Sequence, residues 1–206
     1  MTYTHTDSVD YYREPVRKIT STAGTKNYCK ELKRPKTARM RATQRVRIAK
    51  DVLAQLNAGT ILAKRGDYVT WSDADFTKVL RKSEANEKIV LPDVVSACAI
   101  GSVFTAALDR YDAMRIKDLA SPGYAEIEDH DMLMYLQPWF EEDELRLMEC
   151  IFENTDSDYC SMDPETIEAF KEKAIKQSRS KTQSTAEKIL RAMMRNIVKN
   201  NGEFVL

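Results

Sequence analysis

One stretch of the chain, VVSACAIGSVFTAAL from 94 to 108, is apolar around its whole circumference when it is drawn as a helix. A helix without a polar face has to be covered on all sides, so it is expected at the centre of the protein. Pro92 suits the first turn, and small residues such as Ala99 and Gly101 let neighbouring elements approach closely. A chain of 206 residues can supply those neighbours within one main domain. We therefore expect a mainly α-helical fold around this segment.

Amphipathic segments on both sides predict the helices that cover this centre. Apolar residues recur at helical spacing over 43–57, over 141–153 and again before Asn201. Gly59 is suited to end the first of these helices, and Pro164 is suited to open another. One further helix is expected to begin at Ser72, where Asp75 three residues later completes a capping box. Another is expected to contain Met132, Leu133 and Leu136 and to end before Pro138.

The segment TILAKRGDYVTW, residues 60–71, has a different pattern, in which two short β-prone runs flank a turn at Arg65 and Gly66. This pattern predicts a hairpin. Residues 1–40 hold few large aliphatic side chains and many Thr, Lys and Arg residues. The expected architecture is a multi-helix bundle-like domain over 41–206 with one small β-hairpin, preceded by a basic, flexible arm over 1–40.

Charge is distributed in blocks, although 32 basic and 32 acidic side chains cancel over the whole chain. Residues 11–50 carry 13 Lys and Arg against two acids, a net charge of +11. Residues 124–172 carry 16 acids against two basic residues, or −14, and residues 173–199 carry eight basic residues against one acid, or +7. Such blocks indicate contact with another macromolecule. The predicted partner-binding residues are Lys30, Lys33, Arg34, Lys36, Arg39, Arg41, Arg45 and Arg47.

Two kinds of partner fit this basic segment. Its arginines could line a DNA or RNA backbone, with Tyr28 stacking on a base. Alternatively, the segment could pair with the acidic block of its own chain, of a second copy or of another protein. We favour protein partnership or self-association, because the acidic block would repel a polyanion. Nucleic-acid binding through the basic arm is the alternative.

Catalytic and metal chemistry find little support in the sequence. Cys98 with His130 could form a cysteine-dependent enzyme, a second alternative, but Cys98 falls inside the apolar segment, where an inert buried thiol is the commoner case. The spacing of Asn154, Asp156, Asp158 and Glu165 resembles a calcium loop, yet Tyr159 stands where such loops need glycine. No CxxC or HxxxH pair is present. We expect no catalytic residue, no cofactor and no metal site.

The chain is expected to reside in the cytoplasm. Its four cysteines form no CxxC pair, which is typical of a reducing compartment. No apolar run approaches the roughly 20 residues that a membrane span needs, so no membrane contact is expected.

Three pieces together, RIAKDVLAQLNAG (47–59), ACAIG (97–101) with FEEDELRLMECIFE (140–153), and RAMMRNIVKNNGEF (191–204), resemble a family of small uncharacterised helical proteins of bacteriophages and bacteria. The resemblance covers about half of the chain. It brings no catalytic residues to transfer. It implies a non-enzymatic, phage-type accessory protein, an inhibitor or adaptor acting on a host or phage protein, with a role in counter-defence, in the host cytoplasm if phage-encoded.

Overall fold

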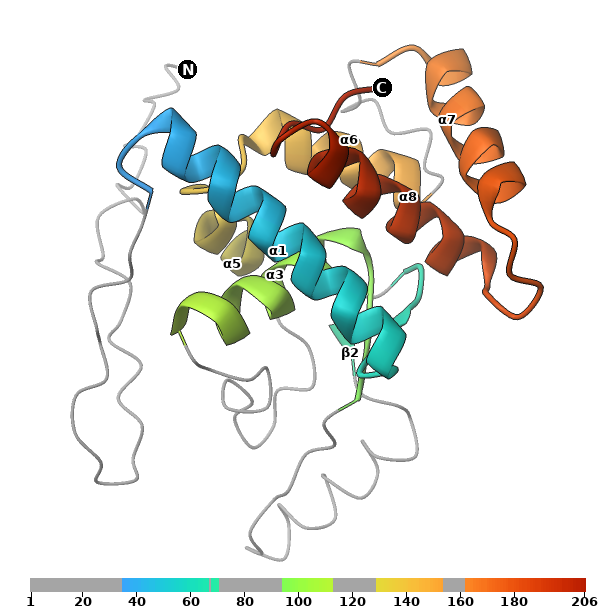
Figure 1. Ribbon diagram of the computed structural model, residues 1–206, viewed down its shortest axis with the longest axis horizontal. Coiled ribbons are helices and arrows are strands. Elements are labelled where there is room, and N and C mark those ends of the chain that lie inside the picture. Colours follow the sequence, from blue (N-terminus) through green and yellow to red (C-terminus); the bar gives the residue numbers. More distant parts are fainter. Residues whose placement is uncertain (1–34, 67, 71–93, 113–128, 154–161) are drawn as a thin grey trace, which may run out of the picture. The chain divides into compact units, whose positions relative to one another are not determined.

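The computed structural model describes residues 35–66, 68–70, 94–112, 129–153 and 162–206. The chain divides into two units, and all described residues belong to Glu31–Leu206, whereas Met1–Lys30 lies outside them. The described elements, shown in Figure 1, are α1 (Ala38–Ala58), β1 (Ile61–Ala63), β2 (Val69–Thr70), β3 (Val95–Ala97), α3 (Ala99–Ala107), the π-helical turn η1 (Leu108–Asp112), α5 (Asp129–Leu136), α6 (Glu142–Glu153), α7 (Pro164–Gln177) and α8 (Thr185–Lys199). The predicted mainly helical fold is confirmed.

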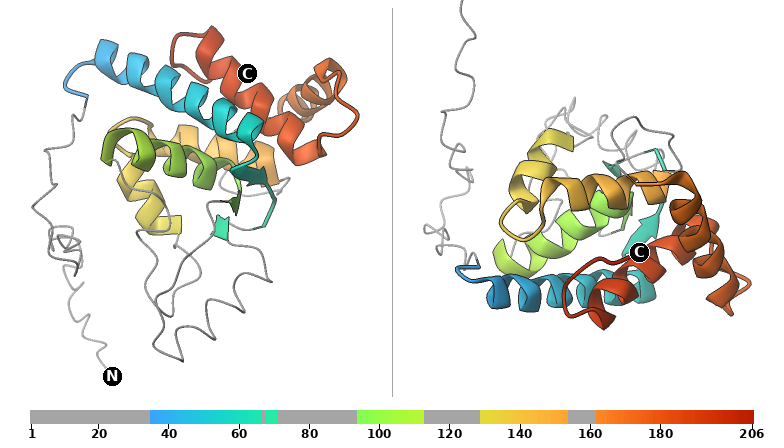
Figure 2. Two further views of the ribbon diagram at one scale, coloured as in Figure 1. Left: turned by 60° about the horizontal axis from the view of Figure 1, so that its bottom comes forward. Right: turned by 90° about the horizontal axis from the view of Figure 1, so that it is seen from above.

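Helices α1 and α8 lie side by side and antiparallel. The side chain of Arg191, in the first half of α8, donates to Asn57 Oδ1 near the end of α1 at 2.7 Å. At the other end of the pair, Gly202 lies against the backbone of Ala42. Figure 2 shows the two helices as one layer, with α3, α5 and α6 on its inner side. The inner faces of α1 and α8 contact α3 and α6 respectively.

Helix α3 is the predicted centre of the fold, and all nine of its residues are buried. Its predicted start is wrong, however. Residues 95–97 form a strand rather than helical turns, and Cys98 in extended geometry caps the helix by accepting the Gly101 N–H at its Sγ atom, 3.4 Å away. The β-branched Val95 favours the extended form, and pairing with two other strands stabilises it.

The small sheet has the order β1-β3-β2, so the predicted hairpin pairing is wrong. The two β-prone runs do form strands, but β3 lies between them, parallel to β1 and antiparallel to β2. The Val95 N–H donates to Thr60 O and the Lys64 N–H donates to Ala97 O, both at 3.0 Å. Val95 and Ala97 are buried, so β3 contributes side chains to the core while its backbone pairs with β1 and β2.

Gly101 allows a close backbone approach between this sheet and α3. A Cβ atom added at this position would lie 1.6 Å from Tyr68 O. The same carbonyl accepts the Cys98 N–H at 3.2 Å. A glycine is therefore required where the first turn of α3 meets the chain leading into β2.

The remaining predicted helices are confirmed where the structure describes them. Gly59 ends α1 in the left-handed conformation with a φ of 70°. Asp163 caps α7 and Pro164 occupies its first turn. The tail after α8 forms no strand. The helix expected from Ser72 and the calcium-like positions Asn154, Asp156 and Asp158 lie outside the described residues.

The core gathers around α3 and draws its largest side chains from the segment that joins α5 to α6 and from the helices themselves. Trp139 and Phe140 are fully buried, and the Trp139 indole N–H donates to Gln44 Oε1 on α1 at 2.7 Å.

Within the described ranges, no helix has both the length and the apolar character needed to cross a membrane.

Candidate binding surface

The outer side of the α1–α8 layer carries a group of cationic side chains, which we call the α1–α8 basic face. Helix α1 has five basic residues and one acid, and α8 has four basic residues and one acid, giving +4 and +3. Figure 2 shows α3, α5 and α6 on one side of both helices, and the buried residues of each helix pack on that side, so the exposed residues lie on the outer side of the layer. The face consists of Lys36, Arg39, Arg47 and Lys50 from α1 and the residue pair before it, and Lys188, Arg195 and Lys199 from α8.

Helical spacing explains why these side chains share one side of each helix. Arg39 and Lys50 are eleven residues apart, close to three turns, and Arg47 lies within about a quarter-turn of both. Lys188, Arg195 and Lys199 are separated by seven and four residues, with the same result. At 1.5 Å per residue each stripe is about 16 Å long. Lys188 is half-buried and the other six side chains are exposed.

The acids that belong to these two helices do not neutralise the face. Asp51 Oδ2 on α1 lies 2.7 Å from Arg110 Nη1, outside the face. Glu187 on α8 accepts from the buried Arg191 at 2.7 Å. Among the described residues, no ion pair involves any of the seven cations of the face. One exposed acid, Glu203, follows α8 and places a single negative charge at the end where α1 begins.

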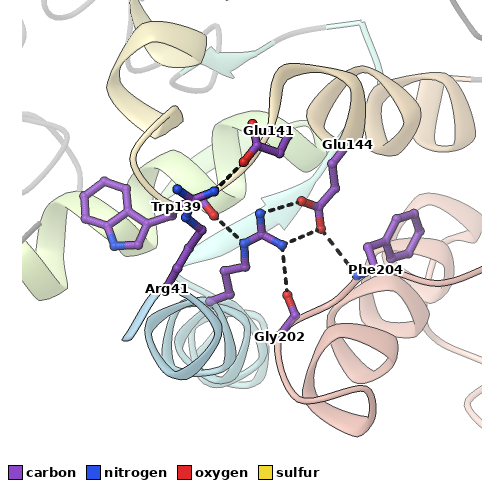
Figure 3. A network of polar contacts seen from close by, with 7 residues as sticks. Arg41, Trp139, Glu141, Glu144, Gly202 and Phe204 are labelled. Atoms are coloured by element: carbon purple, nitrogen blue, oxygen red, sulfur yellow. Dashed lines mark hydrogen bonds and ion pairs between the residues drawn. The ribbon is translucent and has the colours of Figure 1, made fainter. Parts of the chain in front are cut away.

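Two arginines of α1, Arg41 and Arg45, pair with Glu141 and Glu144 instead, and Figure 3 shows Arg41 directed toward Glu141. Arg45 is buried, with Nε donating to Trp139 O and Nη1 donating to Gly202 O at 3.2 Å. Its Nη2 lies 2.9 Å from Glu144 Oε2. Arg41 pairs with Glu141 at the more exposed edge of the same interface. The Phe204 N–H also donates to Glu144, at 3.3 Å, so the network fixes the tail after α8.

Burial dominates the electrostatics of this internal pair. It lowers the pKa of Arg45, against the attraction of Glu144. It also raises the pKa of Glu144, against the opposing effect of Arg45 and of the Phe204 N–H. The Arg45 guanidinium lies 5.0 Å from the centre of the Phe140 ring, which further covers it. Arg45 is thus a structural cation.

A hollow of about 250 Å³ adjoins the first half of α1. Arg39 and Arg47 of the basic face are among the residues that line it. Burial raises the pKa of the nearby Tyr111, against the opposing effects of Arg110 and of Arg47. The described residues that line the hollow are Thr37, Arg39, Met40, Thr43, Gln44 and Arg47.

The alternative site at Cys98 has the geometry of a structural thiol. The side chain is buried, and this burial raises its pKa to about 12. Cys150 is also buried. The side chain of His130 lies outside the described part of the chain. No three His, Cys, Asp or Glu side chains that the structure describes come together as metal ligands.

The predicted partner-binding residues divide into three groups. Lys36, Arg39 and Arg47 are exposed, whereas Arg41 and Arg45 are engaged inside the chain. Lys30, Lys33 and Arg34 lie outside the described residues. The prediction did not include Lys50, Lys188, Arg195 and Lys199. The sequence signal for Lys50 was the +11 block over 11–50, and that for the three residues of α8 was the +7 block over 173–199, whose place beside α1 follows from the antiparallel contact of the two helices.

Comparison of the chain with protein-family models, with curated proteins and with solved structures finds no match. The function therefore has to be argued from the residues of the chain itself.

Proposed function

We propose that this chain is a non-enzymatic interaction protein, an inhibitor or adaptor, that binds a negatively charged macromolecular partner through the α1–α8 basic face. The observation that carries the proposal is the gathering of seven cations without described ion pairs from two helices far apart in sequence. Burying or pairing these charges on a partner would release counterions and stabilise a complex. A cytoplasmic location, in the host if the protein is phage-encoded, belongs to the same proposal.

The internal arginines support a binding role for the external ones by contrast. Arg41 and Arg45 sit on the same helix as Arg39 and Arg47, and both have acidic partners within the chain. Contact with acids at α6 explains the positions of Arg41 and Arg45, but it does not explain why the exposed cations gather on the outer side. Cysteine-dependent catalysis is disfavoured because the Cys98 thiol is buried and stays protonated at neutral pH.

Retention on immobilised heparin, a general polyanion, tests this proposal with the full chain. The variant R47Q/R195Q removes one exposed cation from each helix of the face, and K173Q/K176Q removes the same charge from α7 as a matched control. We expect R47Q/R195Q to elute at a clearly lower salt concentration, while K173Q/K176Q elutes with the wild type. Equal elution of all three proteins would contradict a role for this face.

A further inference from the structure

The chemistry of the basic face indicates which class of polyanion it binds, on the premise that the proposed binding function holds. We infer that the partner is the phosphate backbone of a double-stranded nucleic acid. The face contributes side chains from both α1 and α8, so it extends beyond the basic arm that the sequence singled out. Three properties of the described residues favour this partner over an acidic protein or a single strand.

The first property is the shortage of apolar anchors. Stable protein interfaces draw most of their energy from buried aromatic and large apolar side chains surrounded by a polar rim. On α1 and α8 the only large apolar side chain among the described exposed ones is Met40. Leu62, Val94, Met134 and Ile175 lie on other parts of the chain, and Val205 and Leu206 lie in the tail that follows α8. A phosphate backbone needs cations and hydrogen-bond donors but no apolar centre.

The second property concerns stacking. Proteins that hold single strands combine cations with aromatic side chains on which the bases stack. Helices α1 and α8 contain no aromatic residue. Tyr111, whose hydroxyl donates to Gln44 O on α1, is half-buried and stacked on Trp139 with ring centres 5.0 Å apart. A duplex, whose bases are already stacked on each other, fits this face better than a single strand.

The third property is shape. Two packed helices lie about 8–10 Å apart, so together with their side chains they are wider than the major groove of about 12 Å. They cannot enter a groove together and instead offer a broad cationic layer to the backbone. The stripes of about 16 Å match the rise of roughly five base pairs at 3.4 Å each. The binding should therefore be independent of base sequence.

The acidic block does not oppose this docking, because several of its members are turned toward the chain itself. Glu141 and Glu144 face Arg41 and Arg45 on the inner side of α1. Glu153 accepts the Gly66 N–H at 2.7 Å, near the sheet. Figure 2 places α6 on the side of the layer opposite to the outer side of α1. The negative charge of these described acids is thus directed away from the basic face.

Fluorescence anisotropy with a labelled 30-base-pair DNA duplex of mixed sequence tests the inference on the full chain. Arms with an RNA duplex, a DNA single strand and an acidic peptide, poly-L-glutamate, identify the source of the anion. Removing two phosphate contacts should lower the slope of log Kd against log salt by about 2. It should also weaken duplex binding roughly 10- to 100-fold at 0.1 M salt. We expect this result for R47Q/R195Q and a change below about twofold for K173Q/K176Q, with unchanged circular dichroism for both.

Each outcome bears on the inference. Face-dependent binding of the DNA or the RNA duplex supports it, and the relative affinities then tell which duplex is preferred. Duplex binding that R47Q/R195Q leaves unchanged overturns it, because the contact would lie elsewhere. Face-dependent binding of poly-L-glutamate or of the single strand without the duplexes also overturns it but preserves the proposed function. If none of the probes binds and heparin retention is independent of the face, both fail.

Discussion

Replacing Arg45 by methionine isolates the part of the basic segment that acts inside the fold. The change keeps much of the side-chain volume and removes the guanidinium from Glu144, Trp139 O and Gly202 O. Breaking a buried ion pair by removing one partner costs about 3–5 kcal/mol, because a charge is left without compensation. The Glu144 side chain keeps 15% exposure and its bond from Phe204, which places the expected loss near the lower end, at about 3 kcal/mol.

The matched control is Arg41→Met, one turn earlier on the same helix. Its partner pair with Glu141 has side-chain exposures of 41% and 70%, and exposed pairs contribute at most about 1 kcal/mol. Urea unfolding followed by circular dichroism at pH 7 measures both changes. A loss of about 3 kcal/mol corresponds to a melting temperature roughly 6–12 °C lower for a chain of this size. The double variant R45M/E144L should recover part of the loss, because it also removes the uncompensated carboxylate.

The pH dependence gives an independent check. Burial holds the pKa of Glu144 above its ordinary value, and loss of Arg45 raises the pKa further. A carboxyl whose pKa is raised on folding contributes stability below its unfolded pKa and loses this contribution as the pH rises through the raised value. The penalty of R45M should therefore shrink as the pH falls from 7 to about 4.5, whereas the R41M effect stays small. Equal losses for the two variants, or a pH-independent R45M penalty, would refute this reasoning.

Three further changes test the inner structure. Gly101→Ala should cost about 4 kcal/mol in urea unfolding, since its Cβ would meet Tyr68 O at 1.6 Å, and near-native stability would contradict that contact. Cys98 should react with Ellman's reagent at pH 8 only when the chain unfolds, because burial raises its pKa to about 12. The stability that the protonated thiol contributes is present below pH 9.0 and is lost as the pH rises toward 12. Rapid labelling of the native protein that Cys98→Ala abolishes would revive a catalytic thiol. Ser184→Ala removes the cap that accepts the Glu187 N–H at 3.1 Å and should cost about 1 kcal/mol, so an unchanged unfolding midpoint would exclude a capping contribution.

The helices were predictable because their signals are local. Gly59 and Pro164 mark helix ends through backbone geometry that needs no distant partner. The strand at 95–97 was not predictable in this way. These residues could have extended α3 toward the N-terminus, and they form a strand because they pair with β1 and β2. Strand pairing across more than 30 residues of chain leaves no mark in a local pattern.

The candidate surface was predictable only in part. The charge blocks located the cations of α1 but did not separate inner from outer ones. A signal was present, since Arg45 lies three and four residues before the buried Ile48 and Ala49 and thus on their apolar stripe. The contribution of α8 depended on its antiparallel contact with α1, which charge counting along the chain cannot supply.

The acidic and basic blocks meet on the inner side of α1, and our proposal assigns binding to its outer side. Helix α6 carries five acids and one arginine, and Glu144 from it meets Arg45 across the inner interface of α1. Glu149 accepts from the Tyr68 hydroxyl and so holds the chain leading into β2. Once these acids are engaged inside, they are held away from the outer cations, which keep their charge available. An acidic helix behind α1 thus stabilises the layer, and the cations that it does not contact are the ones that we propose to bind a polyanion.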